Sequence, residues 1–368
     1  MIDKKRIALN GICPYFTMFP LEFPYSILNN LASPKEWVID PFCGRGTTNY
    51  ASRILGLPSI GIDSNPVAVA LSQAKLANTS PRSIMRVALH ILDEVVIPQD
   101  IPSGEFWDWA FHKDVLHMIC RFREGLLKDC RSDARQALRA AIMGALHGPI
   151  AKSYPSYFSN QCQRTYAPKP RYAVNFWKSR ILTPQPVNVL NIIEKRAERY
   201  YSHEATKAVG KIIHGDSRDK SVYSRIRIGS KFNWVITSPP YYGMNTYIPD
   251  QWLRSWFIGE QPIVDYSAKG QISHSSPDVF ATQLKYVWQN VGALCVPGAR
   301  LVIRFGAIND RKVDSLSLLK QSLQKSGWDI KTINSAGTAS SGKRQALQFS
   351  HPSKGAIEEH DIWGLWEG

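Results

Sequence analysis

The chain has 368 residues, with 45 lysines and arginines against 30 acidic residues and a formal net charge of +15. That length suits two domains, or one large domain with an insertion, and a hydrophobic content of 44% excludes a disordered chain. The sequence has no apolar run of about 18 residues, and its first ten residues hold no apolar segment, so we expect no transmembrane helix, no signal peptide and no membrane partner.

The first part of the chain alternates between strand and helix patterns. Two short apolar runs each end in an acid, which is typical of buried parallel strands that stop at a functional edge. A turn with two glycines follows the first run. In chain order we predict a strand over 37–40, a turn over 41–48, a helix over 49–55, a strand over 59–63 and a helix over 65–76. This alternation predicts a doubly wound α/β sheet.

The pattern changes after residue 79, where apolar residues recur at helical spacing. Helices are predicted over 83–97, 112–128, 133–147 and 187–203. The stretch 148–186 is rich in Pro, Ser, Tyr and Lys and is predicted to be irregular.

Strand patterns return in the last part of the chain. Strands are predicted over 211–216, 233–237 and 299–305, a helix over 314–326, and a closing strand pair over 328–333 and 361–366. We therefore expect residues 1–79 and 208–368 to form one α/β domain, and residues 80–207 to form a mainly helical insertion.

The excess positive charge lies mostly in the insertion. Residues 80–214 carry 20 basic and 12 acidic side chains, whereas residues 1–79 carry 7 and 5. No acid occurs from 134 to 193, and seven aromatic residues accompany the later cations of that stretch. Cations bind phosphates and aromatic faces stack on bases, so this pattern favours nucleic acid over a merely solvated face. The candidate contact residues are Arg164, Lys169, Arg171, Lys178 and Arg180.

Six cysteines are present, and no two of them form a C-x-x-C pair. This spacing suggests neither a zinc site nor a thioredoxin-type site, so no metal is expected. The thiols are interpreted as reduced, which favours a cytoplasmic protein.

The first motif with chemical content is Asp40-Pro-Phe-Cys-Gly-Arg-Gly-Thr47. A glycine turn between a strand and a helix lets the backbone approach a ligand at the carboxyl edge of a sheet. Asp63 ends the next strand, where an acid can bind ribose hydroxyls. A dinucleotide oxidoreductase is disfavoured because the third glycine of G-x-G-x-x-G is absent, and a phosphate-binding P-loop is disfavoured because no G-K-[ST] is present.

The second motif is Thr237-Ser-Pro-Pro-Tyr-Tyr242, directly after an apolar strand. Its two prolines fix the backbone and remove two donors, which leaves carbonyl oxygens and the Ser238 hydroxyl as acceptors. Tyr241 adds an aromatic face. Such an array suits the amine of a planar base. A proline-rich turn with a buried tyrosine is the alternative, and the glycine turn in the same sheet favours the functional interpretation.

The two motifs together resemble those of the S-adenosylmethionine-dependent amino-methyltransferases of DNA, which methylate N4 of cytosine or N6 of adenine. "DPFCGRGTT" and "GIDSNP" resemble the cofactor motifs of that family, and "TSPPYYG" resembles its catalytic motif. "YFTMFP" at 15–20 and "HGDSRD" at 214–219 resemble two further cofactor segments. The resemblance covers roughly residues 12–79 and 211–306 and implies a Rossmann-like methyltransferase sheet.

The resemblance implies a role for particular residues. Ser238, Pro239, Pro240 and Tyr241 would hold the target base. The Ser-Pro-Pro-Tyr form is the one most associated with N4-cytosine members. In such arrangements a large insertion often serves for target recognition. The residues that would bind S-adenosylmethionine are Tyr15, Phe16, Thr17, Asp40, Phe42, Cys43, Gly44, Gly46, Asp63, Ser64 and Asp216, with Asp63 at the ribose and Asp216 near the adenine.

The reaction expected from this resemblance is direct transfer of a methyl group to an exocyclic amine. Acceptors at Ser238 and Pro239 would polarise the amine N–H bonds, with proximity as the main catalytic effect. The target base must leave the duplex, and stacking on Tyr241 offsets part of that cost. A C5-cytosine mechanism needs a cysteine nucleophile, usually in a Pro-Cys dipeptide, and no cysteine here follows a proline.

Three function classes follow from the sequence. A DNA amino-methyltransferase is favoured, with N4-cytosine first and N6-adenine second, acting on double-stranded DNA with a flipped base. An RNA base methyltransferase on the same scaffold is the alternative. A nucleic-acid-binding protein with an inactive fold is disfavoured by the intact motifs. The resemblance allows a restriction-modification role with a cognate restriction enzyme as partner, and the oligomeric state is unknown.

Overall fold

The computed structural model describes residues 4–15, 19–148, 155–159, 169–203, 206–207, 209–227, 229, 231–243, 248–265, 271–306, 313–338 and 358–368. The chain divides into two compact units. The sheet unit comprises residues 16–72, 208–246 and 268–368. The helical unit comprises residues 1–15, 73–207 and 247–267. The helical unit thus includes three segments that were expected in the α/β domain, namely 1–15, 73–79 and 247–267.

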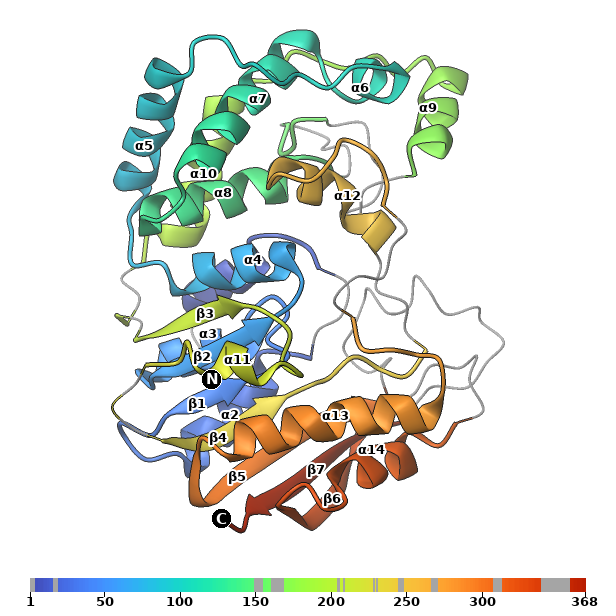
Figure 1. Cartoon of the computed structure of the whole chain (residues 1–368). Coiled ribbons are helices and arrows are strands. Elements are labelled where there is room, and N and C mark those ends of the chain that lie inside the picture. The colour runs from blue at the N-terminus through green and yellow to red at the C-terminus, as the bar shows by residue number, and fades with distance from the viewer. Residues whose placement is uncertain are drawn as a thin grey trace. The chain divides into compact units, whose positions relative to one another are not determined.

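The sheet unit is built on seven strands in the order β3-β2-β1-β4-β5-β7-β6 (Figure 1). β7 runs antiparallel to both β5 and β6, and the other neighbouring strands are parallel. The strands are β1 (Val38–Asp40), β2 (Ser59–Asp63), β3 (Gly210–His214), β4 (Phe232–Thr237), β5 (Cys295–Gly306), β6 (Trp328–Thr338) and β7 (Glu358–Trp366). The prediction of a doubly wound, Rossmann-like sheet is confirmed, including the closing strand pair.

Helices cover both faces of this sheet, because its central strands are apolar on both sides. In Figure 1, α13 (Pro277–Gly292) and α14 (Ser315–Leu323) lie in front of the sheet, and α2 (Glu22–Leu31) and α3 (Thr47–Leu55) lie behind it. The short helix α11 (Lys220–Tyr223) follows β3. The core on the front face joins strand residues such as Ile39 and Val235 to Phe280 and Trp288 of α13, all buried.

α4 (Pro66–Leu76) follows β2, and the division between the units falls within it, after Ser72. It begins with a proline at a position where no intrahelical N–H is needed, as predicted. Its first turn is fixed by the Asn65 side chain, which accepts the Val67 N–H at 2.9 Å.

The helical unit contains the four long helices predicted for the insertion. Three of them begin at a Ser or Asn side chain that accepts a backbone N–H of the first turn, namely Ser80, Ser132 and Asn188. The helices of the unit are α1 (Lys4–Ile7), the 3-10 helix η1 (Ala8–Gly11), α5 (Pro81–Glu94), α6 (Glu105–Ala110), α7 (Lys113–Lys128), α8 (Asp133–Ala145), α9 (Pro170–Ser179), α10 (Val189–Tyr201) and α12 (Ile248–Phe257). None of the described helices is long and apolar enough to cross a lipid bilayer.

The prediction that 148–186 is irregular was wrong for α9. Pro170 occupies the first turn, where its missing N–H costs nothing, and Ala173, Val174 and Trp177 bury one face of the helix. Trp177 packs against Phe106 of α6 at 5.6 Å between ring centroids. The prolines that suggested a loop lie outside the helix or at its start.

Candidate active site

The turn after β1 and the turn after β2 are joined through one carboxylate. The Gly44 N–H donates to Asp63 Oδ2 at 2.8 Å, and the Asn65 N–H donates to Asp63 Oδ1 at 2.8 Å. Burial raises the pKa of the Asp63 carboxyl, and these two amides offset part of the rise. Asp63, predicted to bind a ribose, therefore also holds the glycine turn in shape.

The glycine turn has open space on one side. Gly44 and Gly46 have φ values of +51° and +74°, in the left-handed region that favours glycine. A Cβ added at Gly44 would meet no atom within 4 Å, whereas one at Gly46 would lie 2.8 Å from Ser72 Oγ. The Ser72 hydroxyl in turn donates to the Gly44 carbonyl at 2.7 Å. Gly46 thus serves close packing against α4, whereas the space beside Gly44 is open, which fits the predicted cofactor cradle.

Asp40 links the glycine turn to the strand that precedes the second motif. Its side chain is fully buried, and Oδ1 accepts the Thr237 hydroxyl at 2.6 Å and the Phe42 N–H at 3.0 Å. Burial raises the pKa of the Asp40 carboxyl to about 7, although the hydroxyls of Thr237 and Thr48 lower it. The ends of β1 and β4 are therefore fixed to each other by side chains.

The acidic turn after β3 contacts the same edge of the sheet. The Gly215 N–H donates to the Asp63 carbonyl at 3.0 Å, and the Ser217 hydroxyl donates to the Pro41 carbonyl. Asp216, predicted to lie near the cofactor adenine, accepts the Arg218 Nε–H at 2.9 Å and forms an ion pair with that guanidinium. Arg218 also donates to Gln283 Oε1 of α13 at 2.6 Å.

The second motif leaves the end of β4 with Ser238 half-buried and Pro239 buried. Tyr241 packs edge-on against Phe305 of β5, with ring centroids 5.3 Å apart. Its hydroxyl donates to Glu359 Oε1 at 2.8 Å. Burial and the Glu359 carboxylate hold the pKa of Tyr241 well above its usual range.

The second tyrosine of the motif is held by a different group of residues. Tyr242 lies edge-on to Phe280 of α13 at 5.4 Å, and its ring is 5.9 Å from that of His274. His274 Nδ1 accepts the Gly243 N–H at 3.0 Å and so fixes the end of the motif. Tyr241 and Tyr242 are thus anchored to separate parts of the sheet unit.

The sheet unit brings together most of the predicted site residues at the carboxyl ends of β1, β2, β3 and β4. Phe42 packs edge-on against Trp288 at 6.1 Å, and the Ser64 carbonyl lies 3.1 Å from His214 Nε2. Tyr15 belongs to the helical unit, and Phe16 and Thr17 lie outside the described residues. The predicted residues gathered in the sheet unit are Asp40, Phe42, Cys43, Gly44, Gly46, Asp63, Ser64, Asp216, Ser238, Pro239, Pro240 and Tyr241.

The predicted nucleic-acid contacts belong to the helical unit and centre on α9. Lys169, Arg171, Lys178 and Arg180 are all exposed, and Arg164 lies outside the described residues. Lys178 forms an ion pair with Glu105 of α6, and the Arg180 guanidinium lies 4.0 Å from the centroid of the Phe176 ring. Among the aromatic residues of this helix, Tyr172 is 70% exposed and Trp177 is buried. The aromatic residues therefore divide between core and surface.

The sequence did not predict the roles of three residues of the site. Thr237 begins the second motif, but nothing in the sequence indicated that its hydroxyl binds Asp40. The ion pair of Arg218 with Asp216 could have been found from their spacing, because a turn brings side chains two residues apart close together. Glu359 gave no local signal, because its contact with Tyr241 joins residues 118 positions apart.

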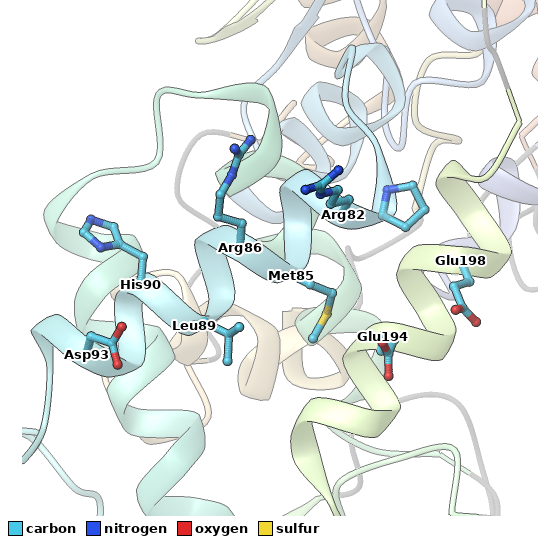
Figure 2. A pocket seen from close by; sticks show the side chains of 9 residues that line it. Arg82, Met85, Arg86, Leu89, His90, Asp93, Glu194 and Glu198 are labelled. Carbon is cyan, nitrogen blue, oxygen red and sulfur yellow. The ribbon is translucent and has the colours of Figure 1, made fainter.

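A shallow pocket of about 650 Å³ lies within the helical unit, between α5 and α10 (Figure 2). Figure 2 shows Met85 and Leu89 on the side of α5 that faces α10, where Glu194 and Glu198 lie, whereas the Arg82 and Arg86 side chains point away from α10. It contains none of the predicted site residues. No group of three or more potential metal ligands occurs among the residues that the structure describes.

Comparison with known proteins supports the family that the motifs resemble. Residues 3–74 match the family model described as DNA methylase, which covers N6 and N4 enzymes. A stretch of 93 residues is 29% identical to the Type II methyltransferase M.MjaII of Methanocaldococcus jannaschii. That match covers 25% of this chain and 18% of the length of that protein. The match to this family implies S-adenosylmethionine as the methyl donor.

Solved structures of methyltransferases are also similar to this chain. The rRNA methyltransferase aviRa of Streptomyces viridochromogenes is 13% identical, with a TM-score of 0.40 over 100% of this chain and 94% of that one. A SAM-dependent methyltransferase of Methanosarcina mazei is 9% identical, with a TM-score of 0.33 over 95% of this chain and 97% of that one. At these values we draw no functional inference from them, and the strand order itself defines the fold.

Proposed function

We propose that this chain is an S-adenosylmethionine-dependent DNA methyltransferase that modifies the exocyclic N4 amine of a flipped cytosine, in the cytoplasm. The observation that carries the proposal is the connection between its two motifs. Asp40 of the glycine turn and Thr237 of the Ser-Pro-Pro-Tyr turn share a hydrogen bond of 2.6 Å. A methyl donor held by the first turn and a base held by the second would then meet at one edge of the sheet.

The residues of the first turn suit a cofactor that carries a ribose and a charged sulfonium. Open space lies beside Gly44, Asp63 ends β2, and Asp216 follows the neighbouring strand β3. When bound there, S-adenosylmethionine supplies an electrophilic methyl group. Arg218 holds the Asp216 carboxylate in a fixed orientation, so that acid would be a preformed acceptor for the cofactor amine.

The residues of the second turn suit a planar base with an exocyclic amine. The Ser238 oxygen and the carbonyl before Pro239 would accept the amine N–H groups and localise the nitrogen lone pair. Held in this way, the amine would direct its lone pair at the methyl group that the cofactor supplies, and after transfer it would release one proton to water. These residues would orient the two reactants and form no covalent intermediate. Orientation of this kind raises the reaction rate by several orders of magnitude.

Two alternatives share this chemistry. The substrate of an N6-adenine enzyme carries the same kind of amine on a larger base. The substrate of an RNA enzyme carries the same bases outside a DNA duplex. The Ser at position 238 favours cytosine, because adenine members more often have Asp or Asn there. The exposed cations of α9 suit phosphate contacts with either nucleic acid.

The direct test incubates the purified chain with S-adenosylmethionine labelled in its methyl group, together with double-stranded DNA or with RNA. Digestion to nucleosides and mass spectrometry then identify the product. We expect N4-methylcytosine from the DNA. Label in N6-methyladenine would replace the base assignment, and label in RNA alone would replace the substrate assignment. Absence of cofactor binding by calorimetry would exclude every enzymatic version.

The Tyr241→Ala variant tests the division of labour between the two turns. Loss of the ring should lower methylation about 5- to 150-fold, since stacking on one base is worth roughly 1–3 kcal/mol. Cofactor affinity should stay within about twofold, because Tyr241 is anchored to Phe305 and Glu359 rather than to the glycine turn. A large fall in cofactor affinity would contradict the role given to this residue.

A further inference from the structure

The Tyr241 hydroxyl is bound by an acid from the last strand of the sheet. Glu359 is only 4% exposed, and its Oε1 accepts the Tyr241 O–H at 2.8 Å. A buried carboxylate must be compensated by hydrogen bonds or charge, so a contact of this kind has a specific geometry. Neither residue belongs to the glycine turn.

The backbone beside this contact is shaped to permit it. Gly306 of β5 is the direct cross-strand partner of Glu359 in β7. A Cβ at Gly306 would lie 3.1 Å from Glu359 Cγ and 3.3 Å from Tyr241 Cε2, closer than ordinary contact at both points. The absence of a side chain at 306 therefore lets the Glu359 side chain cross the sheet to Tyr241.

A neighbouring cation of β5 is bound by a different acid. Arg304, two residues before Gly306, is held by both carboxylate oxygens of Asp361 at 2.8 Å. It also lies over the Phe23 ring, 3.8 Å from the centroid. The nearest cation of β5 is thus engaged by another acid.

Tyr241 is held by contacts on its ring as well as on its hydroxyl. The ring lies edge-on to Phe305 at 5.3 Å, and the hydroxyl donates to Glu359. Burial and the Glu359 carboxylate raise the pKa of the Tyr241 hydroxyl, and Ser238 lowers it.

We propose that Glu359 is a positioning residue of the methyl-transfer site, which holds the Tyr241 hydroxyl and thereby orients the Tyr241 ring toward the target base. This inference rests on the proposed function for the identity of the base. The orientation of Tyr241 by Glu359 does not rest on it and is measurable without any reaction.

The first test reads the position of Tyr241 directly. The full chain is produced with 3-fluorotyrosine, and the ¹⁹F signal of Tyr241 is assigned by its loss in the Tyr241→Phe variant. Glu359→Leu should move that signal toward the value of an unrestrained tyrosine, whereas Glu359→Gln, which keeps an acceptor, should move it less. Glu367→Gln, an exposed acid just beyond β7, is the control and should leave it in place.

The second test measures single-turnover methyl transfer with saturating cofactor. Glu359→Leu should lower the rate about 10- to 100-fold, the value of one hydrogen bond to a charged group, while Glu359→Gln should stay within about fivefold of the wild type. In the Tyr241→Phe background, Glu359→Leu should cause no further loss, because it acts through the missing hydroxyl. Cofactor affinity should not change in any of these variants.

The outcomes separate the two proposals. An unmoved ¹⁹F signal in Glu359→Leu would overturn the positioning role whether or not the chain is active. Additive losses in the double variant, or equal losses for Gln and Leu, would also overturn it. A wild-type chain that transfers no methyl group but shows the expected ¹⁹F changes would refute the proposed function and leave the orientation of Tyr241 standing.

Discussion

The buried carboxyl of Asp40 makes the stability of the sheet unit depend on pH in a defined direction. We consider the Asp40→Asn variant, in which an amide replaces the protonated acid at nearly the same volume. The Asn oxygen still accepts the Thr237 hydroxyl and the Phe42 N–H, so the packing of the site is kept. The substitution removes only the ability to ionise.

The size of the effect follows from the pKa. The Asp40 carboxyl titrates near 3.8 when unfolded and at about 7 when folded. Between these values the folded chain holds a proton that the unfolded chain has lost, so stability falls as pH rises. The slope is about 1.4 kcal/mol per pH unit, and the full change is about 4 kcal/mol. Below about pH 4 and above about pH 7 this contribution is constant.

Equilibrium urea unfolding at pH 4.5, 6 and 8 measures the effect. Asp40→Asn should become progressively more stable than the wild type as pH rises, with most of the gain between pH 4.5 and pH 7. Asp219→Asn is the control. The hydroxyl and amide of Ser221 lower the pKa of exposed Asp219, so the stability that Asp219 contributes is lost only in acid. The difference in unfolding free energy between Asp219→Asn and the wild type should therefore be constant from pH 5 upward.

A difference between wild type and Asp40→Asn that does not vary with pH would refute this reasoning. So would a wild type that gains stability over the variant as pH rises. That result would mean that the hydrogen bonds from Thr237, Thr48 and Phe42 outweigh burial and that Asp40 is ionised in the folded chain.

Other variants test the glycine turn and the α9 surface. Gly46→Ala should cost about 1–3 kcal/mol of unfolding free energy, because of its positive φ and the 2.8 Å approach to Ser72, whereas Gly44→Ala should cost about 1 kcal/mol and abolish cofactor binding by calorimetry. If Gly44→Ala and Gly46→Ala lost equal stability and equal cofactor affinity, the role of Gly44 in the cofactor cradle would be refuted. Replacing Lys169 and Arg171 by Ala should reduce the slope of log affinity against log salt for DNA by about 2, while Lys178→Ala, whose ammonium is already paired with Glu105, should reduce it less. An unchanged slope in the double variant would indicate a merely solvated face.

Much of the fold was predictable because patterns of neighbouring residues determine its strands and helices. The strands over 37–40 and 59–63 are apolar runs between turn residues, and the helices of the insertion show clear apolar spacing. α9 was missed because proline-rich flanks hid a helix of ten residues. α13 was missed although Ser276 and Pro277 mark its start and Phe280, Leu284 and Val287 line its buried face, a pattern that the sequence does contain.

The site was predictable only as far as its motifs extend along the chain. The glycine turn and the Ser-Pro-Pro-Tyr turn each act through consecutive residues. The bond between Asp40 and Thr237 joins positions 197 apart and depends on the pairing of β1 with β4. Glu359 reaches Tyr241 only through the register of β7 against β5. Neither register is encoded near the residues concerned.

The place of β7 between β5 and β6 also sets an order of assembly. β6 precedes β7 in the chain, yet within the sheet it pairs with β7 alone. On a ribosome, β6 therefore has no docking edge until β7 has emerged, and an isolated pair of strands is marginal in water. Glu359 arrives with that strand. The nascent chain thus gains the acceptor for Tyr241 in the same event that closes the sheet, so a chain without β7 would lack the contact that holds the Tyr241 hydroxyl.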